Sequence, residues 1–293
     1  MKLVRKPYLI LFACISLLFS ACEDVIDVDL TEGRSQLVVD GFLTNDSSIQ
    51  TIRLTRTANF FSNAPTPPFN GADVKVIGPG GQVFNFTSDG NGNYRYDPLT
   101  AGAIDSVGFN YRLELVYNGD NYIATSILNP VPVIDSMTYA FEEESIGNEE
   151  GYFAQFFARD FAGRKDFYWI RGLKNGTYIN AAEPSSLVLA EDASFGGEGA
   201  DGFVFITPLR GSITSSDDPL QIGDVAGVEL MSINKEVFNF LQQLTTQANN
   251  GGLFSTPPAN IRPNIFDAAG QIQEEVLGVF SVSSVSRSQV LIQ

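Results

Sequence analysis

The stretch YRLELVYNGDNYIATSI, residues 111–127, decides the fold class. Apolar and polar residues alternate from Tyr111 to Tyr117, and a second alternating run follows at Tyr122–Ile127. Between the two runs stand Asn118 and Gly119. An Asn-Gly pair in this position favours a two-residue turn, because both residues tolerate the positive φ angles that such a turn requires. The stretch therefore predicts an antiparallel β-hairpin.

Similar short runs occur on both sides of this hairpin, with Gly, Asn and Asp between them. Before it, the alternating runs are Gln36–Leu43, Gln50–Thr57, Ala72–Gly78, Gln82–Thr87 and Asn93–Tyr96. After it, they are Asp135–Phe141, Tyr152–Ala158, Asp166–Arg171, Gly202–Leu209, Val225–Ile233 and Val276–Ser286. Many short strands with frequent turn residues are typical of antiparallel sandwiches. The sequence thus predicts a mainly β protein.

A proline-rich stretch, NPVP at residues 129–132, interrupts the alternating pattern. Two closely spaced prolines favour a stiff, extended connection, so we place a domain boundary there. We expect two antiparallel β-sandwich-like domains. Residues 36–131 form an N-terminal sandwich of immunoglobulin-like or regulatory type, and residues 132–293 form a C-terminal β-rich domain.

Residues 234–247 of the second domain carry the clearest helix signal in the sequence. Apolar residues recur there at spacings of three and four, beginning at Val237, which is typical of an amphipathic helix. Ser232 or Asn234 is expected to cap the start of this helix with its side chain. The second domain is therefore predicted to contain one amphipathic helix.

The N-terminus resembles a bacterial lipoprotein signal. Three basic residues near the start precede an apolar core, Tyr8–Leu18, that is too short to span a membrane. Small residues then lead to Cys22, as in a lipobox, where the cysteine is acylated before cleavage. We expect residues 1–21 to be the signal peptide and Cys22 to be the lipidation site, which anchors the chain to a bilayer.

An acidic tether, residues 22–35, follows the anchor. In its composition the segment after Cys22 resembles a surface-export signal, with Glu23, Asp24 and Asp27 as the acidic residues. The alternative is a solvated tether that carries no address. This resemblance to an export signal implies a protein of the outer membrane that faces the cell exterior, with the periplasmic face as the alternative.

Charge and histidine content exclude several classes of function. Removing the three basic residues of the signal leaves 15 basic and 34 acidic residues, a net charge of −19, which disfavours nucleic acid as a partner. Histidine is absent, which excludes Ser-His-Asp triads and histidine-ligated metals. We therefore expect no enzyme, no cofactor and no metal site, although carboxylate-based hydrolysis and oxygen-ligated calcium remain as minor alternatives.

Two glycine-rich stretches resemble ligand loops but fit them poorly. Asp89–Asn93 begins like a calcium loop, yet Tyr94 stands where that loop needs glycine, so we expect a hairpin turn. Residues Gly197–Gly202 match GxGxxG, but Glu198 would repel a phosphate, so we expect a loop instead of a nucleotide site.

Aromatic residues in the loop TANFFSNAPTPPFNG, residues 57–71, are candidates for partner or ligand contact. They are Phe60, Phe61 and Phe69. Exposed aromatic residues on a loop often mark a contact surface. The alternative is that the loop folds back and buries them.

Five stretches resemble, in order and spacing, the DUF4249 family of Bacteroidota lipoproteins. They are LVVDGFLTND (37–46), GADVKVIGPGG (71–81), PVIDSMTY (132–139), NGGLFSTPPANIRPNI (250–265) and VLGVFSV (276–282). One departure is Arg262-Pro263, where we expect a glycine before Asn264-Ile265. The resemblance implies a partner of a TonB-dependent outer-membrane transporter. Asp105-Ser106 and Asp135-Ser136 also resemble the sequon that is O-glycosylated at serine in exported Bacteroidota proteins.

These observations lead to one main functional hypothesis and two alternatives. The main one is a lipid-anchored accessory protein of a TonB-dependent β-barrel transporter, which captures a nutrient or gates its entry. The first alternative is a structural or adhesive subunit of an outer-membrane assembly, without a small-molecule ligand. The second is a glycan-acting enzyme that uses carboxylates.

Overall fold

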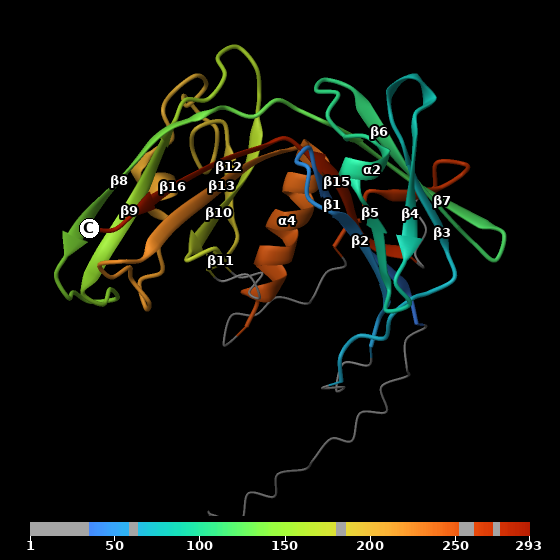
Figure 1. Ribbon diagram of the computed structural model, residues 1–293, viewed down its shortest axis with the longest axis horizontal. Coiled ribbons are helices and arrows are strands. Elements are labelled where there is room, and N and C mark those ends of the chain that lie inside the picture. The colour runs from blue at the N-terminus through green and yellow to red at the C-terminus, as the bar shows by residue number, and fades with distance from the viewer. Residues whose placement is uncertain (1–34, 59–63, 180–185, 252–260, 272–275) are drawn as a thin grey trace, which may run out of the picture. The chain divides into compact units, whose positions relative to one another are not determined.

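Nine strands form one sheet in the order β14-β7-β6-β3-β4-β5-β2-β1-β15. Its strands are β1 Leu37–Thr44, β2 Gln50–Arg56, β3 Asp73–Ile77, β4 Val83–Ser88, β5 Asn93–Tyr96, β6 Asn110–Tyr117, β7 Asp120–Ile127, β14 Ile265–Asp267 and β15 Val276–Ser283. Neighbouring strands are antiparallel, except that β1 and β15 are parallel. The computed structural model (Figure 1) describes residues 35–58, 64–179, 186–251, 261–271 and 276–293.

The hairpin predicted at residues 111–127 is confirmed as β6 and β7. Leu113 and Leu115 are buried, whereas Arg112 lies on the exposed face, as the alternation requires. Asn118 and Gly119 have φ angles of 52° and 95°, the positive values that this tight turn needs. The alternating pattern therefore fixes both the hairpin and the face that packs in the core.

Side chains join the two ends of the nine-stranded sheet. The Phe280 N–H in β15 donates a hydrogen bond of 2.9 Å to Asn264 Oδ1, and Asn264 Nδ2 donates one of 2.7 Å to the Phe280 carbonyl. The Val282 N–H donates to Ser126 Oγ in β7 at 2.8 Å. The sheet thus curls around one buried core, which includes residues from both ends, such as Ile265 and Phe280.

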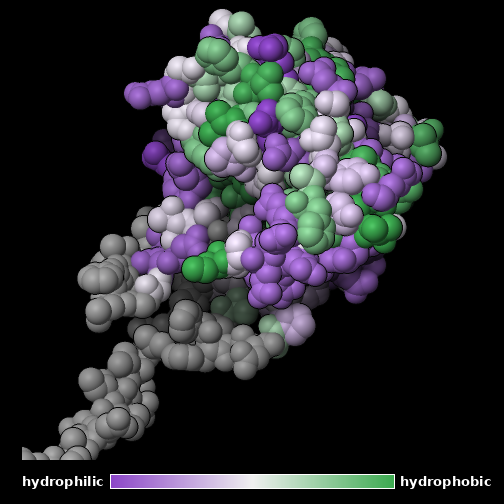
Figure 2. Space-filling model, turned by 90° about the vertical axis from the view of Figure 1, so that its left-hand side faces the viewer, coloured by the Kyte–Doolittle hydropathy of each residue, from purple (hydrophilic) through white to green (hydrophobic). Residues whose placement is uncertain are grey.

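A second group of strands has its own core. β10 Phe167–Lys174 lies between β13 Val225–Ile233 on one side and β11 Thr177–Tyr178 and β12 Val188–Glu191 on the other, and β16 Val285–Leu291 pairs with β13. A separate hairpin comprises β8 Ile134–Glu142 and β9 Gly151–Ala158. The side of the molecule that carries this hairpin is a mosaic of hydrophilic and hydrophobic side chains (Figure 2).

The longest described helix, α4 Lys235–Ala248, packs against both groups of strands. Val237, Phe238 and Leu241 are buried and share a core with Phe167 of β10 and Val279 of β15. Short helical segments are η1 Pro79–Gly81, α2 Pro98–Ala101 and α3 Thr207–Gly211. The amphipathic helix predicted at 234–247 is present, and its apolar face covers the junction between the two sheets.

The predicted side-chain cap of this helix is wrong. Asn234 occupies the N-cap position but makes no capping hydrogen bond. Its Nδ2 instead donates to Ser126 Oγ at 3.2 Å, and Ser232 Oγ donates to the Asn129 carbonyl at 2.7 Å. Both side chains are buried, so they bond to groups of the first sheet and its connection, and tertiary contacts override the local capping preference.

The structure differs from the predicted division at residues 131 and 132 in one respect. β14 and β15 belong to the nine-stranded sheet, although both lie in the predicted C-terminal domain. Residues 34–293 accordingly group as one compact unit. The proline-rich connection does lie where the chain leaves the first sheet, but the chain later returns to it.

One predicted strand is absent. Within Gly202–Leu209, Val204 forms only an isolated bridge to Arg159, and α3 begins at Thr207. Pro208 stands in the first turn of that helix, where its missing N–H is tolerated and its fixed φ favours the helical start. The alternation of the sequence FVFI is not sufficient to form a strand without a neighbouring ladder.

Candidate functional site

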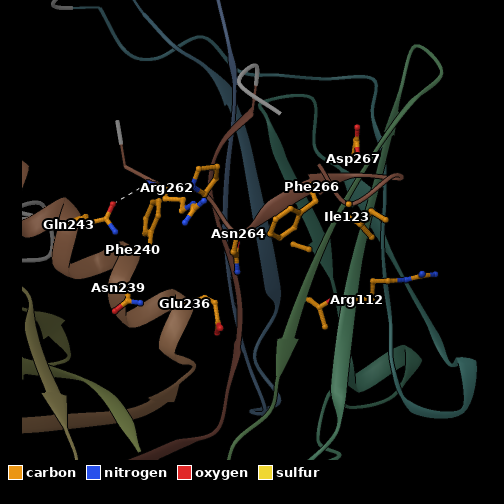
Figure 3. A pocket seen from close by; sticks show the side chains of 14 residues that line it. Arg112, Ile123, Glu236, Asn239, Phe240, Gln243, Arg262, Asn264, Phe266 and Asp267 are labelled. Atoms are coloured by element: carbon orange, nitrogen blue, oxygen red, sulfur yellow. Dashed lines mark hydrogen bonds between the residues drawn. The ribbon is translucent and has the colours of Figure 1, made fainter. Parts of the chain in front are cut away.

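A groove of about 600 Å³ lies between α4 and the outer face of the strands β6, β7 and β14 (Figure 3). This volume falls within the range of small-molecule sites in proteins. The groove is lined by Arg112, Ile123, Ala124, Thr125, Glu236, Asn239, Phe240, Gln243, Arg262, Pro263, Asn264, Phe266, Asp267 and Gly270. Three segments far apart in the sequence therefore form one concave surface.

The helical wall of the groove is a single stripe along α4. Its residues are Glu236, Asn239, Phe240 and Gln243, at spacings of three and four. Residues at these spacings share one face of an α-helix and span about 10 Å along its axis. Val237 and the other buried residues occupy the opposite side, so the stripe faces the groove, with Phe240 partly packed against the core.

The opposite wall is the outer face of the sheet. Ile123 pairs with Phe266, and Thr125 pairs with Arg112, across neighbouring strands. The adjacent residue Ala124 points into the core, which places Ile123 and Thr125 on the outer side. In Figure 3, Phe266 and Ile123 lie across the groove from Phe240.

The segment Arg262–Asn264 joins the two walls. The Arg262 N–H donates a hydrogen bond to Gln243 Oε1 at 3.2 Å, drawn as a dashed line in Figure 3. Asn264 is 7% exposed, and both ends of its amide are bonded to the backbone of Phe280. The floor of the groove is therefore held on the helix side by Gln243 and on the sheet side by Phe280.

Two of the four charged side chains at the groove have partners within the chain. Arg112 forms an ion pair with Glu114, and its side chain extends away from α4 in Figure 3. Asp267 Oδ1 accepts hydrogen bonds from the Ala269 and Gln271 N–H groups at 2.9 and 2.8 Å. The Arg112 charge is thus compensated by Glu114, and the Asp267 carboxylate is held by backbone hydrogen bonds.

The other two charges, Glu236 and Arg262, differ from this pair. Within the described ranges, neither side chain has a hydrogen bond or an ion pair, and both are exposed. The Asn239 amide also has no hydrogen-bond partner among these residues. The groove therefore offers one anionic, one cationic and one amide group that remain able to bind.

Buried carboxylates occur elsewhere, in the second group of strands. Asp160, Asp166 and Asp192 are at most 5% exposed. Burial raises the pKa of Asp160, although hydrogen bonds from Tyr168 and Gly202 oppose this shift, and burial likewise raises the pKa of Asp166 against the nearby Arg164. Because these carboxylates are almost fully buried, a substrate has no access to them, and we regard them as structural.

Several of the sequence-predicted residues lie outside the described part of the chain. These are the lipidation site Cys22, the export-signal residues Glu23, Asp24 and Asp27, and the loop residues Phe60 and Phe61. Their predicted roles stay predictions.

Phe69 does not form a contact surface. It is 4% exposed, its ring packs on Tyr117 with centroids 4.5 Å apart, and the Arg56 guanidinium lies 4.7 Å from its centre. The Phe69 N–H also donates to the Leu54 carbonyl at 2.9 Å, which draws this part of the loop onto the sheet. The alternative prediction, that the loop folds back and buries its aromatic residues, is confirmed for Phe69.

The two candidate O-glycosylation sites differ in exposure. Ser136 is exposed on β8, whereas Ser106 is half-buried and its N–H donates to Tyr111 Oη at 2.9 Å. Of the two, Ser136 is the more accessible to a modifying enzyme.

The two glycine-rich stretches form turns. Asp89 Oδ1 accepts from the Asn91 N–H at 2.8 Å and Asp89 pairs with Arg95, so this carboxylate closes the turn between β4 and β5. In the GxGxxG stretch, the carboxylate of Asp201 accepts from the Gly163 N–H. Throughout the part of the chain that the structure describes, no three acidic, histidine or cysteine side chains gather as a metal site.

The groove residues were missed because no motif marks them. In the sequence, Glu236, Asn239 and Gln243 form only the polar face of a helix, and their position in a groove depends on the strands opposite. One signal was available: the pair Arg262-Pro263 departs from the family resemblance, which predicts a glycine before Asn264-Ile265, and both residues line the groove.

The fold and the groove define a mainly β protein with a groove beside its longest described helix. A family model described as a domain of unknown function, DUF4249, matches residues 23–289, and the chain belongs to this family. No curated protein matches the sequence. Among the described residues, no helix combines the length and apolar character needed to cross a bilayer.

Proposed function

We propose that this chain is a lipid-anchored accessory protein of a TonB-dependent transporter at the outer membrane, facing the cell exterior. The lipobox-like sequence before Cys22 and the acidic residues after it support the anchor and the location. The chain captures a nutrient, or gates its entry, without chemical turnover. The family resemblance supports the transporter as the partner.

The observation that carries the capture role is the groove beside α4. Asn264 and the Arg262–Gln243 hydrogen bond hold its floor before a ligand arrives, so little conformational entropy is lost on binding. Glu236, Arg262 and Asn239 retain unused hydrogen-bonding capacity toward the groove. A pre-formed site with a few unsatisfied polar groups is typical of ligand binding.

Affinity purification from the native outer membrane tests the partner. The affinity tag is attached to the C-terminus through a flexible linker, because Ile292 is buried and the Gln293 N–H donates to Tyr139 Oη at 3.1 Å. The linker keeps the tag from disturbing these contacts. We expect a β-barrel transporter to co-purify with the wild-type chain and to be lost with Cys22→Ser, which cannot be acylated. Absence of any β-barrel from the wild-type preparation would refute the accessory role.

The second candidate is a structural or adhesive subunit, and the β8–β9 hairpin favours it. Phe141 is 53% exposed near the end of β8, and Ile146 in the connecting loop is fully exposed. Apolar side chains in such positions often contact another protein. Replacing both with serine separates the candidates: loss of a co-purified partner with unchanged ligand binding favours an assembly role for the hairpin.

A further inference from the structure

The length of the groove limits its ligand to a short molecule. The stripe from Glu236 to Gln243 covers about 10 Å of helix. An extended peptide advances by about 3.3 Å per residue, so the stripe matches about three residues. The volume of about 600 Å³ agrees with a ligand of this size.

The two groove charges that have no partner among the described residues, Glu236 and Arg262, lie at opposite ends of this stripe. Glu236 is in the first turn of α4. Arg262 is joined through its N–H to Gln243, two turns further along the helix. A ligand that satisfies both must therefore carry a cation at one end and an anion at the other.

Between the two charges, the groove combines an amide with apolar surface. The Asn239 amide has one acceptor and two N–H donors, which match the N–H and carbonyl groups of a peptide backbone. Phe240, Phe266 and Ile123 provide apolar walls on both sides. A ligand with a polar backbone and apolar side chains fits this arrangement.

We propose that the groove binds a short zwitterionic peptide of about three residues. The peptide's ammonium group lies at Glu236, its carboxylate lies at Arg262, and its backbone bonds to Asn239. This inference names the ligand class of the capture role proposed above and rests on the groove being that capture site. It does not depend on which transporter is the partner.

Other ligand classes leave part of the groove unused. A neutral oligosaccharide would leave Glu236 and Arg262 uncompensated. A ligand with only negative charge would face the Glu236 carboxylate, and the chain as a whole is strongly acidic. The zwitterion compensates both charges and is itself neutral.

Calorimetric titration of the full-length lipidated chain in detergent tests the proposal. The probes are alanyl-phenylalanyl-alanine, its N-acetylated form, its C-amidated form and maltotriose. We expect the free tripeptide to bind and each blocked form to bind about tenfold more weakly, the effect of losing about 1.4 kcal/mol. Maltotriose should not bind at millimolar concentration.

Two variants assign each peptide terminus to its residue. In Glu236→Gln, N-acetylation of the peptide should no longer weaken binding, whereas C-amidation still should. In Arg262→Gln the pattern should be reversed. Glu142→Gln, an exposed carboxylate on β8, is the matched control and should behave as wild type. A variant that merely disturbs folding would weaken all peptides alike, and circular dichroism checks this independently.

Three results would overturn the proposal: equal affinity for free and blocked peptides, binding of maltotriose in preference to peptide, or no peptide binding at millimolar concentration. Each of these can occur while a transporter still co-purifies, so the ligand class can fail without the partner. Conversely, peptide binding without a co-purified transporter would support the groove as a peptide site and refute the transporter as the partner.

Discussion

Two glutamates seven residues apart, Glu229 and Glu236, have opposite surroundings. Glu229 in β13 is 2% exposed, and it bonds to Arg171 Nη1 at 3.1 Å and to Arg287 Nε at 2.7 Å, with Tyr178 Oη also in range. Glu236 in α4 is exposed, and no cation among the described residues pairs with it. A buried charge has to be compensated within the fold, whereas an exposed charge in the groove is solvated and remains able to pair with another molecule.

The largest effect is expected from Glu229→Ala. Removing this carboxylate leaves Arg171 and Arg287 without their shared partner, in a part of the sheet where water has limited access. We expect the free energy of unfolding to fall by about 3 kcal/mol, the lower end for breaking a buried ion pair, because Arg287 is half-exposed and can rehydrate. Guanidinium unfolding measures this change, and a loss below about 1 kcal/mol would contradict the structural role.

Asn264→Ala should have the next largest effect. The substitution leaves the buried N–H and carbonyl of Phe280 without partners and opens the seam between the two ends of the sheet. We expect a loss of about 2–3 kcal/mol from unsatisfied backbone groups. Asn239→Ala, an exposed amide in the same groove, is the control and should change stability by less than about 0.5 kcal/mol. Equal losses of stability in the two variants would contradict a specific contribution of the Asn264–Phe280 hydrogen bonds.

Acid unfolding tests the ion pair between Asp46, which follows β1, and Arg287, which also pairs with Glu229. Burial raises the pKa of Asp46, but hydrogen bonds from Ser48, Arg287 and Thr44 outweigh it and lower the pKa to about 2. Because the folded pKa lies below the ordinary value of 3.8, the stabilisation is present above pH 3.8 and is lost as pH falls through about 2. We expect Asp46→Asn to lose stability less steeply over this window in acid unfolding curves.

An identical pH dependence of stability in wild type and Asp46→Asn would contradict the proposed contribution of the Asp46 carboxylate. Arg287→Gln serves as the reciprocal variant, because Arg287 Nη2 bonds to Asp46 Oδ2 at 2.7 Å. It should flatten the same part of the curve.

The smallest effect on stability should come from Glu236→Ala. Its carboxylate has no ion-pair partner among the described residues, and its place in the first turn of α4 lets it interact with the helix dipole, which contributes about 0.5 kcal/mol. Thermal unfolding should therefore be nearly unchanged, while affinity for the free tripeptide falls. A destabilisation as large as that of Glu229→Ala would place Glu236 among the structural charges and end the contrast between the two residues.

The elements were predictable from the sequence to a considerable degree. Alternation at Tyr111–Tyr117 and the turn at Asn118-Gly119 determine a hairpin locally, and the apolar spacing from Val237 determines which side of α4 is buried. The failures are non-local. FVFI alternates but forms only an isolated bridge, from Val204 to Arg159. The Asn234 side chain bonds to Ser126 in a distant strand and does not cap the helix that follows it.

The groove was less predictable than the elements that form it. The pair Arg262-Pro263 departs from the expected glycine before Asn264-Ile265, but nothing in the sequence placed Arg262 beside Gln243. Phe69 shows the converse: an aromatic residue in a polar, proline-rich loop resembled a contact surface, although the hydrogen bond to Leu54 draws it into the core.

By itself the sequence determined the mainly β class, the exclusion of histidine chemistry and the amphipathic helix, because alternation, composition and helical spacing are local properties. Only the tertiary structure decided that β14 and β15 return to the first sheet. This return sets Arg262 and Phe266 opposite Glu236 and Asn239 and so creates the groove. The physical reason is that such a site depends on packing between distant segments, which local periodicity does not encode.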